Sequence, residues 1–204
     1  MLLKGTPYVY QGEELGITNV RFPSIKDYQD IWSISQYESA IREGYSEREA
    51  LEAVWRFSRD NSRTPMHWDD SLNAGFSEHQ PWLGVNPNYL QINAKRALRN
   101  PDSVYYFYQK LIHLRKNSQA LIHGDYTLLE PNHEKVWAFT RTYGQEELLM
   151  ILNFSNQQTD FAAPEQLLPI TDKKIMLSNV PKRLPDTNDG IRLHPYEARV
   201  YLVK

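Results

Sequence analysis

The spacing of apolar residues changes at about residue 118. Before it, residues 46–55 and 103–116 repeat apolar side chains three and four positions apart, which predicts helices with one buried face. The first of these starts with Ser46 and Glu49, a pair typical of a capping box, and we expect another helix just before it. After residue 118, short apolar runs predict strands at 126–129, 136–142, 148–154, 174–177 and 198–203, separated by turns at 132–133, 144–145, 156–157 and 189–190.

The two parts differ in what they can bury. The later strands can pair with one another, and their spacing predicts an antiparallel sandwich. The first part offers one short strand, Tyr8–Gln11, an excursion over 18–34 without a clear period, and a long loop over 73–89. One strand and a few helices do not bury their apolar faces alone. We therefore expect residues 1–118 to be the end of a larger αβ domain, and residues 119–204 to be a separate β-sandwich domain.

The composition of the chain limits the kinds of molecule that it can be expected to bind. Hydrophobic residues make up 41% and charged residues 24%, as in ordinary globular proteins. The net charge of -2 provides no basic field for nucleic acid, and no apolar run approaches the roughly 20 residues of a membrane span. The chain has no cysteine, and its six histidines lack metal-ligand spacing. We expect no metal, cofactor, nucleic-acid or membrane partner, and a cytoplasmic location.

Two long motifs carry a resemblance to a known family. Residues 5–16, GTPYVYQGEELG, resemble the eighth barrel strand of glycoside hydrolase family 13. Residues 59–69, RDNSRTPMHWD, are similar to the branch that holds oligo-1,6-glucosidases, dextran glucosidases and trehalose-6-phosphate hydrolases. Further matching segments follow in the same order at 73–76, 81–89 and 103–116. The resemblance spans the chain and is densest before residue 118.

The resemblance implies a fold that is α/β plus all-β. Residues 1–118 would be the C-terminal end of a (β/α)8 barrel, with its last strand at 5–11 and its last helix at 103–116. Residues 119–204 would be the antiparallel β-sandwich domain that follows. Active sites of such barrels lie at the C-terminal ends of the strands. The turn at 11–14 and the loop at 59–69 would then lie there together.

The family's chemistry requires two carboxyl groups. A retaining glycosidase uses a carboxylate nucleophile and a carboxylic acid roughly 5–5.5 Å apart. In the family these groups follow earlier strands, in motifs that do not occur in this sequence. We do not expect Glu13, Glu14, Asp60 or Asp69 to replace them, because adjacent carboxylates on one turn point in different directions. No catalytic residue is therefore predicted, and the chain alone is expected to be inactive.

Arg63 and Arg59 are the predicted substrate-binding residues. The resemblance implies that Arg63 reaches the non-reducing glucose, where a guanidinium fork suits two sugar hydroxyls and a carboxylate. The structural alternative is a salt bridge within the loop. Arg59 either borders the site of the leaving sugar or holds the loop. The chain departs from the branch at His67, where glutamine is usual, and at Trp32, where glutamate is usual.

Other residues near these motifs favour structural roles. One of Glu13 and Glu14 should face the mouth of the barrel, but we expect both to form hydrogen bonds to neighbouring strands and loops. We expect Trp68 and Trp82 to be core residues that anchor loops rather than to stack on sugar. In the second domain, the alternation of Trp137 and Phe139 is typical of core residues.

The predicted parent activity is exo-acting hydrolysis of terminal α-1,6 or α-1,4 glucosidic bonds in short oligosaccharides. Expected partners are that substrate, and either the N-terminal half of the barrel or a second copy of the chain. A phosphotrehalase is one alternative, although no Lys or Arg pair for a phosphate stands out in the sequence. A non-catalytic carbohydrate-binding or interaction module is the other.

Overall fold

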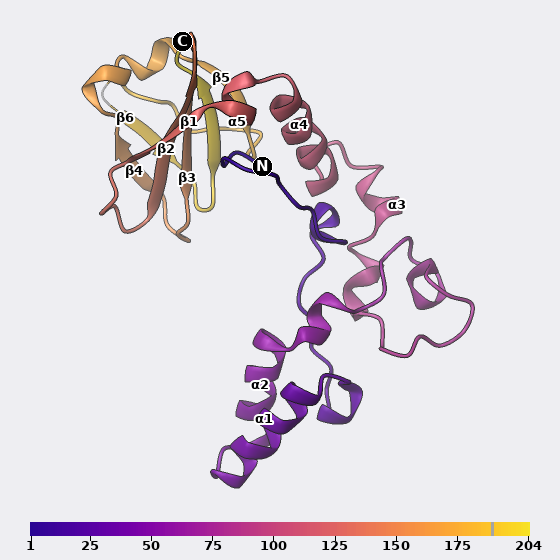
Figure 1. The fold of residues 1–204 in the computed structure, drawn as a ribbon. Helices are drawn as coiled ribbons and strands as arrows, with labels where there is room; N and C mark the ends of the chain where they lie inside the picture. The colour runs from indigo at the N-terminus through magenta and orange to yellow at the C-terminus, as the bar shows by residue number, and fades with distance from the viewer. Residues whose placement is uncertain (189) are drawn as a thin grey trace. The chain divides into compact units, whose positions relative to one another are not determined.

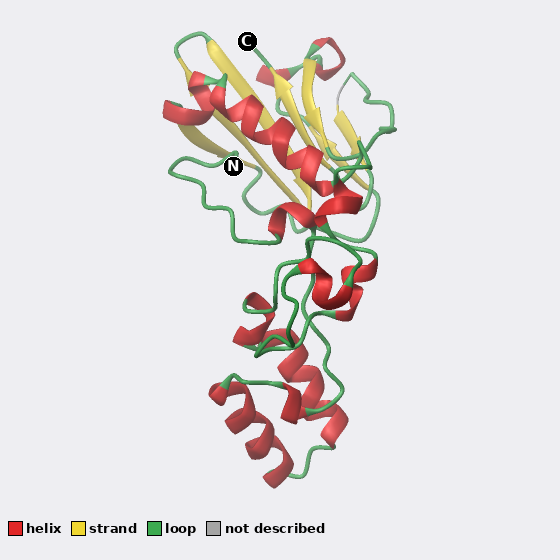
Figure 2. Cartoon of the chain, turned by 90° about the vertical axis from the view of Figure 1, so that its right-hand side faces the viewer, coloured by secondary structure: helices red, strands yellow, loops and turns green. Residues whose placement is uncertain are grey.

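The computed structural model describes residues 1–188 and 190–204, and it divides into two compact units. One unit combines Met1–Tyr8 with Phe107–Lys204, and the other is Val9–Tyr106. All the strands belong to the first, whereas the second holds helices and loops (Figures 1 and 2). The helices are α1 (Ile31–Arg42), α2 (Glu47–Phe57), α3 (Ala94–Ala97), α4 (Val104–Lys116) and α5 (Gln119–His123). The strands are β1 (Asp125–Leu129), β2 (Val136–Tyr143), β3 (Glu146–Asn153), β4 (Thr159–Ala162), β5 (Lys174–Ser178), β6 (Gly190–Leu193) and β7 (Ala198–Leu202).

The strands form the predicted antiparallel sandwich. Five lie in one sheet in the order β1-β2-β3-β7-β5, and β4 pairs with β6 in a second sheet. All five strands predicted after residue 118 are confirmed, but β4 and β6 were missed because four-residue strands give too short an alternation to recognise. The predicted turn at 144–145 joins β2 to β3, and Gly144 has a φ of 57° there. The turn at 189–190 begins at a residue outside those described.

Both faces of the five-stranded sheet are buried. One face packs against the β4–β6 sheet through side chains from both sheets, among them Ala138, Ile151, Phe161, Ile191 and Tyr201. The other face packs Phe139, Leu148, Met150 and Val200 against Ala120 and Leu121 of α5. The prediction that Phe139 is a core residue is confirmed. Trp137 is partly buried, and its ring centroid lies 5.1 Å from that of Phe139.

Three arginines, two of them buried, hold segments of the first unit together through hydrogen bonds. Arg199 is fully buried and pairs with Glu197 and with Asp186, whose Oδ1 lies 2.5 Å from Nη1. Arg141 is also buried, and its guanidinium donates to the carbonyls of Gly124 and Leu2. Arg115 donates to the carbonyls of Met1, Leu3 and Gly5. Arg115 and Arg141 therefore fasten the first residues of the chain to the sandwich.

The predicted strand at 8–11 is not formed. No described segment pairs with it, and Tyr8 is 90% exposed. A strand needs a neighbour to accept its N–H and C=O groups, and without one the segment stays irregular. The division into compact units falls at Tyr106 and Phe107 and assigns Met1–Tyr8 to the sandwich unit. The boundary predicted after residue 118 separates the barrel domain of the family from its β-sandwich domain, which is a different division, and it stays a prediction.

The second unit has a small core of its own. Val20, Phe22, Tyr28, Val54 and Leu83 are buried together, beside the packed pair α1 and α2. The capping box at the start of α2 is confirmed. The excursion is more regular than expected, since its last residues, including the half-exposed Trp32, begin α1. The predicted helix at 103–116 is confirmed as α4.

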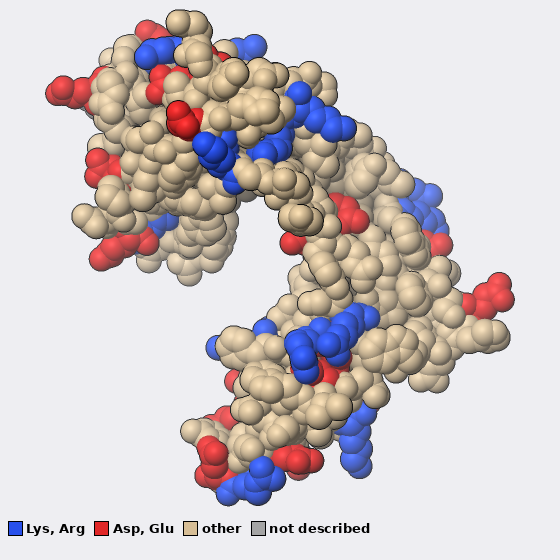
Figure 3. All heavy atoms as spheres, viewed as in Figure 1, with Lys and Arg blue, Asp and Glu red and all other residues tan. Residues whose placement is uncertain are grey.

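Charge is distributed without a dominant sign. Basic and acidic side chains are interspersed on the face drawn in Figure 3. Within residues 1–188 and 190–204, no helix is both long and apolar enough to cross a membrane.

The buried Arg199–Glu197 pair provides a test of the sandwich. Glu197→Gln removes one of the two carboxylates that contact the buried guanidinium, while Asp186 still neutralises its charge, so we expect unfolding free energy to fall by roughly 1.5–3 kcal/mol. Asp160→Asn, at the exposed pair with Arg192, is the matched control and should cause no measurable loss. Denaturant unfolding of the whole chain measures both. Equal effects would show that the buried pair does not hold the sandwich together.

Candidate functional site

The predicted meeting of the 11–14 turn and the 59–69 loop is confirmed. Tyr10 Oη donates to the carbonyl of Ser62 at 2.8 Å. A small cavity of about 270 Å³ lies between the two segments, lined on one side by Gln11, Gly12 and Glu13 and on the other by Asn61, Ser62 and Thr64. Gly12 has a φ of 91°, and a Cβ there would stand 2.8 Å from the side chain of Ile17. The turn therefore requires glycine at this position.

The two glutamates of the turn bond to its own backbone. The carboxylate of Glu13 accepts from the amide of Tyr10 at 3.2 Å, and that of Glu14 accepts from the amide of Gly12 at 2.9 Å. These contacts favour a structural role for both residues, but they lie within the turn and not with the neighbouring strands and loops that were predicted. Asp69 behaves similarly, because its carboxylate accepts from the amide and hydroxyl of Ser71.

Asp60 fixes the loop at 59–69, called the arginine loop below, through buried hydrogen bonds. Its side chain is fully buried, and Oδ2 accepts from the amides of Gln29 at 2.7 Å and Asp30 at 2.9 Å. Asn61 adds a second attachment, since it accepts from the amide of Val20 and donates to the carbonyl of Trp55. These contacts fix residues 59–62, which form one 3-10 turn, against the excursion and α2.

Arg59 is held by a second buried carboxylate. Its Nε and Nη2 donate to Oδ1 of Asp30 at 2.9 and 2.6 Å, and its backbone amide donates to Oδ2. Burial raises the pKa of Asp30, but the hydrogen bonds from Arg59 and Ser33 outweigh burial and place that pKa well below its usual range. The contact with Asp30 supports the loop-holding alternative for Arg59. The side chain of Arg59 is still 60% exposed, so its predicted place near a leaving sugar stays a prediction.

Arg63 has a different environment. Its Nη1 lies 3.6 Å from Oδ1 of Asp60, which is an ion pair but too long for a hydrogen bond. Among the described residues its guanidinium donates no hydrogen bond, and its side chain is 42% exposed. Asp60 Oδ1 is itself buried and has no hydrogen-bond partner in the described part of the chain. The loop therefore holds Arg59 tightly and leaves the donors of Arg63 available.

The exposure of Trp68 and Trp82 differs from the prediction. Trp68 is 53% and Trp82 67% exposed, so the prediction that they are anchoring core residues is wrong. The backbone anchors this loop instead, because the carbonyl of Ala74 accepts from the amides of both Trp68 and Asp69.

Sequence reasoning missed the role of Asp30, the partner of Arg59. Its position directly before α1 predicts a helix cap, but its side chain makes no capping bond and contacts Arg59 instead, so no local signal pointed to this role. No cluster of three or more histidine, aspartate or glutamate side chains suited to a metal ion occurs in the part of the chain that is described.

Comparison with known proteins decides the family. The profile of the alpha-amylase catalytic domain matches residues 1–124, and that of the C-terminal domain of the alpha-amylase SusG matches residues 136–200. The chain belongs to the alpha-amylase family, glycoside hydrolase family 13. It therefore contains the end of the catalytic barrel domain followed by the C-terminal β domain, as the motifs predict.

Relatives and solved structures lie in the expected branch. The chain is 45% identical over 204 residues to an oligo-1,6-glucosidase of Parageobacillus thermoglucosidasius, covering all of this chain and 36% of the relative. It is 39% identical to a trehalose-6-phosphate hydrolase of Bacillus subtilis, with 98% and 36% covered. The crystal structure of the Bacillus licheniformis trehalose-6-phosphate hydrolase matches with a TM-score of 0.91 at 40% identity, again with 98% and 36% covered. This member of the alpha-amylase family thus spans about a third of the length of the relatives it matches.

His67 provides a pH test of the loop. Its ring is fully buried, and Nδ1 lies 2.8 Å from the carbonyl of Ile92, so Nδ1 carries the proton. Nε2 has no hydrogen-bond partner among residues 1–188 and 190–204. Burial lowers the pKa of His67, although the bond to Ile92 opposes this. The unfolded chain therefore takes up the proton first, and unfolding free energy falls as pH drops below about 6.5, by at most about 1.4 kcal/mol per pH unit.

The measurement is hydrogen exchange at the amide of Ala94, which donates to the carbonyl of His67. We expect its protection to fall between pH 7 and pH 5, and His67→Gln to remove that pH dependence. His79→Gln, at an exposed position of the same unit, is the control and should leave it unchanged. Identical pH profiles in the parent and His67→Gln chains would contradict the assignment.

Proposed function

We propose that this chain is the C-terminal part of an exo-acting retaining α-glucosidase that cleaves terminal α-1,6 or α-1,4 glucosidic bonds of short oligosaccharides. The remaining, N-terminal part of the barrel is its partner and supplies the catalytic carboxylates. The similarity to oligo-1,6-glucosidases supports this, as does that to a glucan 1,6-alpha-glucosidase of Streptococcus pneumoniae, 42% identical over 178 residues. That similarity covers 87% of this chain and 32% of the relative.

The observation that carries the proposal is the state of Arg63. A guanidinium offers several N–H donors in one plane, which suits adjacent sugar hydroxyls. Arg63 keeps these donors unbonded beside a buried carboxylate, whereas the neighbouring Arg59 is bonded to Asp30. The exposed Arg63 guanidinium is thus the group of this loop best suited to the terminal glucose.

The state of the acidic residues supports inactivity of the chain alone. Glu13, Glu14 and Asp69 accept hydrogen bonds within their own turns, whereas Asp60 of the arginine loop and Asp30, directly before α1, are buried. None of them is left as one of two opposed, accessible carboxyl groups. The barrier-lowering pair therefore has to come from elsewhere.

Two alternatives remain to be separated by experiment. A phosphotrehalase is not distinguished by similarity, since the relatives at 39–45% identity include a trehalose-6-phosphate hydrolase. A carbohydrate-binding module would need a free aromatic platform on the sandwich. Trp137 does not offer one, because its ring packs on Phe139 and its Nε1 donates to Tyr126.

The chain alone should not hydrolyse nitrophenyl α-glucoside, isomaltose or maltose. A chimera that joins the N-terminal two thirds of an oligo-1,6-glucosidase relative to this chain should hydrolyse them, with isomaltose preferred over maltose. Steady-state assays of both proteins give the answer. Turnover by the purified chain that disappears when one of its own acidic residues is replaced would overturn the proposal.

Arg63→Ala should lower kcat/KM of that chimera by about tenfold or more, because hydrogen bonds to a charged group contribute roughly 1.5–3 kcal/mol. Its thermal stability should change little, since the Arg63 guanidinium forms only a long ion pair with Asp60, at 3.6 Å, and no hydrogen bond to a described residue. Arg59→Ala is the contrasting variant and should mainly lower the stability of the chain. A decrease in kcat/KM below twofold for Arg63→Ala would indicate that Arg63 has a structural role only.

A further inference from the structure

The carboxylate of Asp60 has one oxygen that the fold does not use. Oδ2 accepts from the amides of Gln29 and Asp30, and these two bonds hold the arginine loop against the residues before α1. Oδ1 is also buried, but among the described residues it accepts no hydrogen bond, which is costly for a charged group. An asparagine would provide the one oxygen that the two amides require. The second oxygen and the negative charge therefore need another explanation.

The geometry of the turn brings Arg63 to that oxygen. Residues 59–62 form a 3-10 turn, and in this type of helix side chains three positions apart lie one above the other. Asp60 and Arg63 have this spacing, and Nη1 lies 3.6 Å from Oδ1. The carbonyl of Asp60 also accepts from the amide of Arg63 at 2.9 Å and from that of Thr64 at 3.2 Å. Asp60 thus contacts Arg63 through both its backbone and its carboxylate.

The separation of 3.6 Å suits an arginine whose donors are needed by a ligand. A hydrogen bond to a carboxylate is about 2.7–2.9 Å long and would occupy N–H groups of the guanidinium, as the contact between Arg59 and Asp30 does. The Coulomb attraction falls only with the inverse of the distance, so it still acts on Arg63. The buried charge of Asp60 therefore attracts the guanidinium without using its donors.

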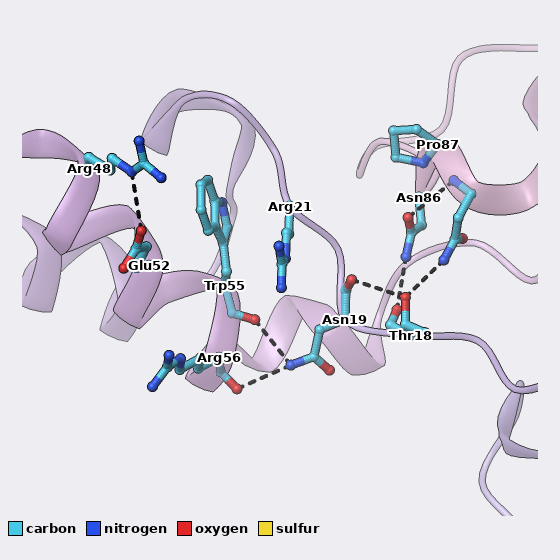
Figure 4. A pocket seen from close by; sticks show the side chains of 10 residues that line it. Thr18, Asn19, Arg21, Arg48, Glu52, Trp55, Arg56, Asn86 and Pro87 are labelled. Carbon is cyan, nitrogen blue, oxygen red and sulfur yellow. Dashed lines mark hydrogen bonds and ion pairs between the residues drawn. The ribbon is translucent and has the colours of Figure 1, made fainter. Parts of the chain in front are cut away.

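Arg56 shows the state of an arginine in the same unit without such a neighbour. It lies in the last turn of α2, and its exposed guanidinium forms no hydrogen bond or ion pair with a described residue (Figure 4). In the described part of the chain, Asp60 is the one carboxylate that forms an ion pair with Arg63. The two arginines thus differ by a single buried charge, which makes Arg56 the natural reference for Arg63.

We propose that Asp60 is a positioning residue for Arg63. Its buried charge orients the guanidinium before the substrate arrives and leaves the N–H groups free for the terminal glucose. Ordering a long side chain in advance removes an entropic cost that binding would otherwise carry. The inference rests on the proposed function for the identity of the ligand, whereas the ordering of Arg63 is a property of this chain alone.

Nuclear magnetic relaxation of arginine Nε–H groups in the whole chain tests the ordering. We expect the order parameter of Arg63 to exceed that of Arg56 in the parent chain, and to fall to the value of Arg56 in Asp60→Asn. This variant keeps an acceptor oxygen for the amides of Gln29 and Asp30 and replaces the unbonded Oδ1 by an uncharged group. An order parameter of Arg63 that is unchanged in the folded variant would overturn the proposal. Equal order parameters of Arg63 and Arg56 in the parent chain would also overturn it, even if Asp60→Asn does not fold.

A double-mutant cycle in the chimera tests whether Asp60 acts on the reaction through Arg63. Asp60→Asn should lower kcat/KM by about fivefold or more when Arg63 is present, and by less than about twofold in the Arg63→Ala background. Asp70→Asn, at the exposed pair with Lys95 in the same loop region, is the matched control and should change kcat/KM by less than about twofold in both backgrounds. Equal losses from Asp60→Asn in both backgrounds would overturn the proposal, because they would show that Asp60 only supports the fold.

The positioning of Arg63 and the proposed function fail in different experiments. A chimera without hydrolytic activity, or one whose kcat/KM is unchanged by Arg63→Ala, would overturn the proposed function. The relaxation measurement needs no activity, so it still decides whether Asp60 orders the guanidinium of Arg63.

Discussion

The helical unit depends on the burial of two carboxylates, Asp30 and Asp60. A charge that is removed from water needs partners, and each of these aspartates takes them from a different part of the chain. Asp60 accepts from the backbone of 29–30, and Asp30 accepts from Arg59 and Ser33. Asp60 thereby holds residues 29–30 in place, and Asp30 holds Arg59. The arginine loop therefore begins at a fixed position, although it contains little regular structure.

This arrangement gives neighbouring arginines different roles. Arg59 completes the shell around Asp30, whereas Arg63 lies just beyond hydrogen-bonding distance of Asp60. Arg21 and Arg56 have no acidic partner among the described residues. In the sandwich unit, by contrast, Arg199 is enclosed by Glu197 and Asp186, and Arg141 bonds carbonyl oxygens. The partner, rather than the residue type, decides whether an arginine supports the fold or remains available to a ligand.

Sequence patterns predicted the helices and caps that depend on nearby residues. The spacing in 103–116 and the Ser46–Glu49 capping box involve residues a few positions apart, and both are present. Five strands after residue 118 are also present, because each apolar run finds a neighbouring strand within the same unit. The strand at 8–11 failed because a strand depends on a neighbour, which no described segment provides. The pairing of Arg59 with Asp30 spans 29 positions, and the exposure of Trp68 depends on loop packing. Neither leaves a periodic signal, so only the family motif pointed to this loop.

The central claim is that Asp30 binds the guanidinium of Arg59, whereas that of Arg63 remains available to a ligand. The exchange of guanidinium protons with water tests this claim most directly. Nitrogen-detected NMR of the chain resolves the Nε–H group of each arginine. The account predicts slow exchange at Arg59, whose Nε lies 2.9 Å from Asp30 Oδ1, lost in the Asp30→Asn variant, and fast exchange at Arg63 in both proteins. Equal protection of Arg59 and Arg63, or slow exchange at Arg59 that survives Asp30→Asn, would contradict it.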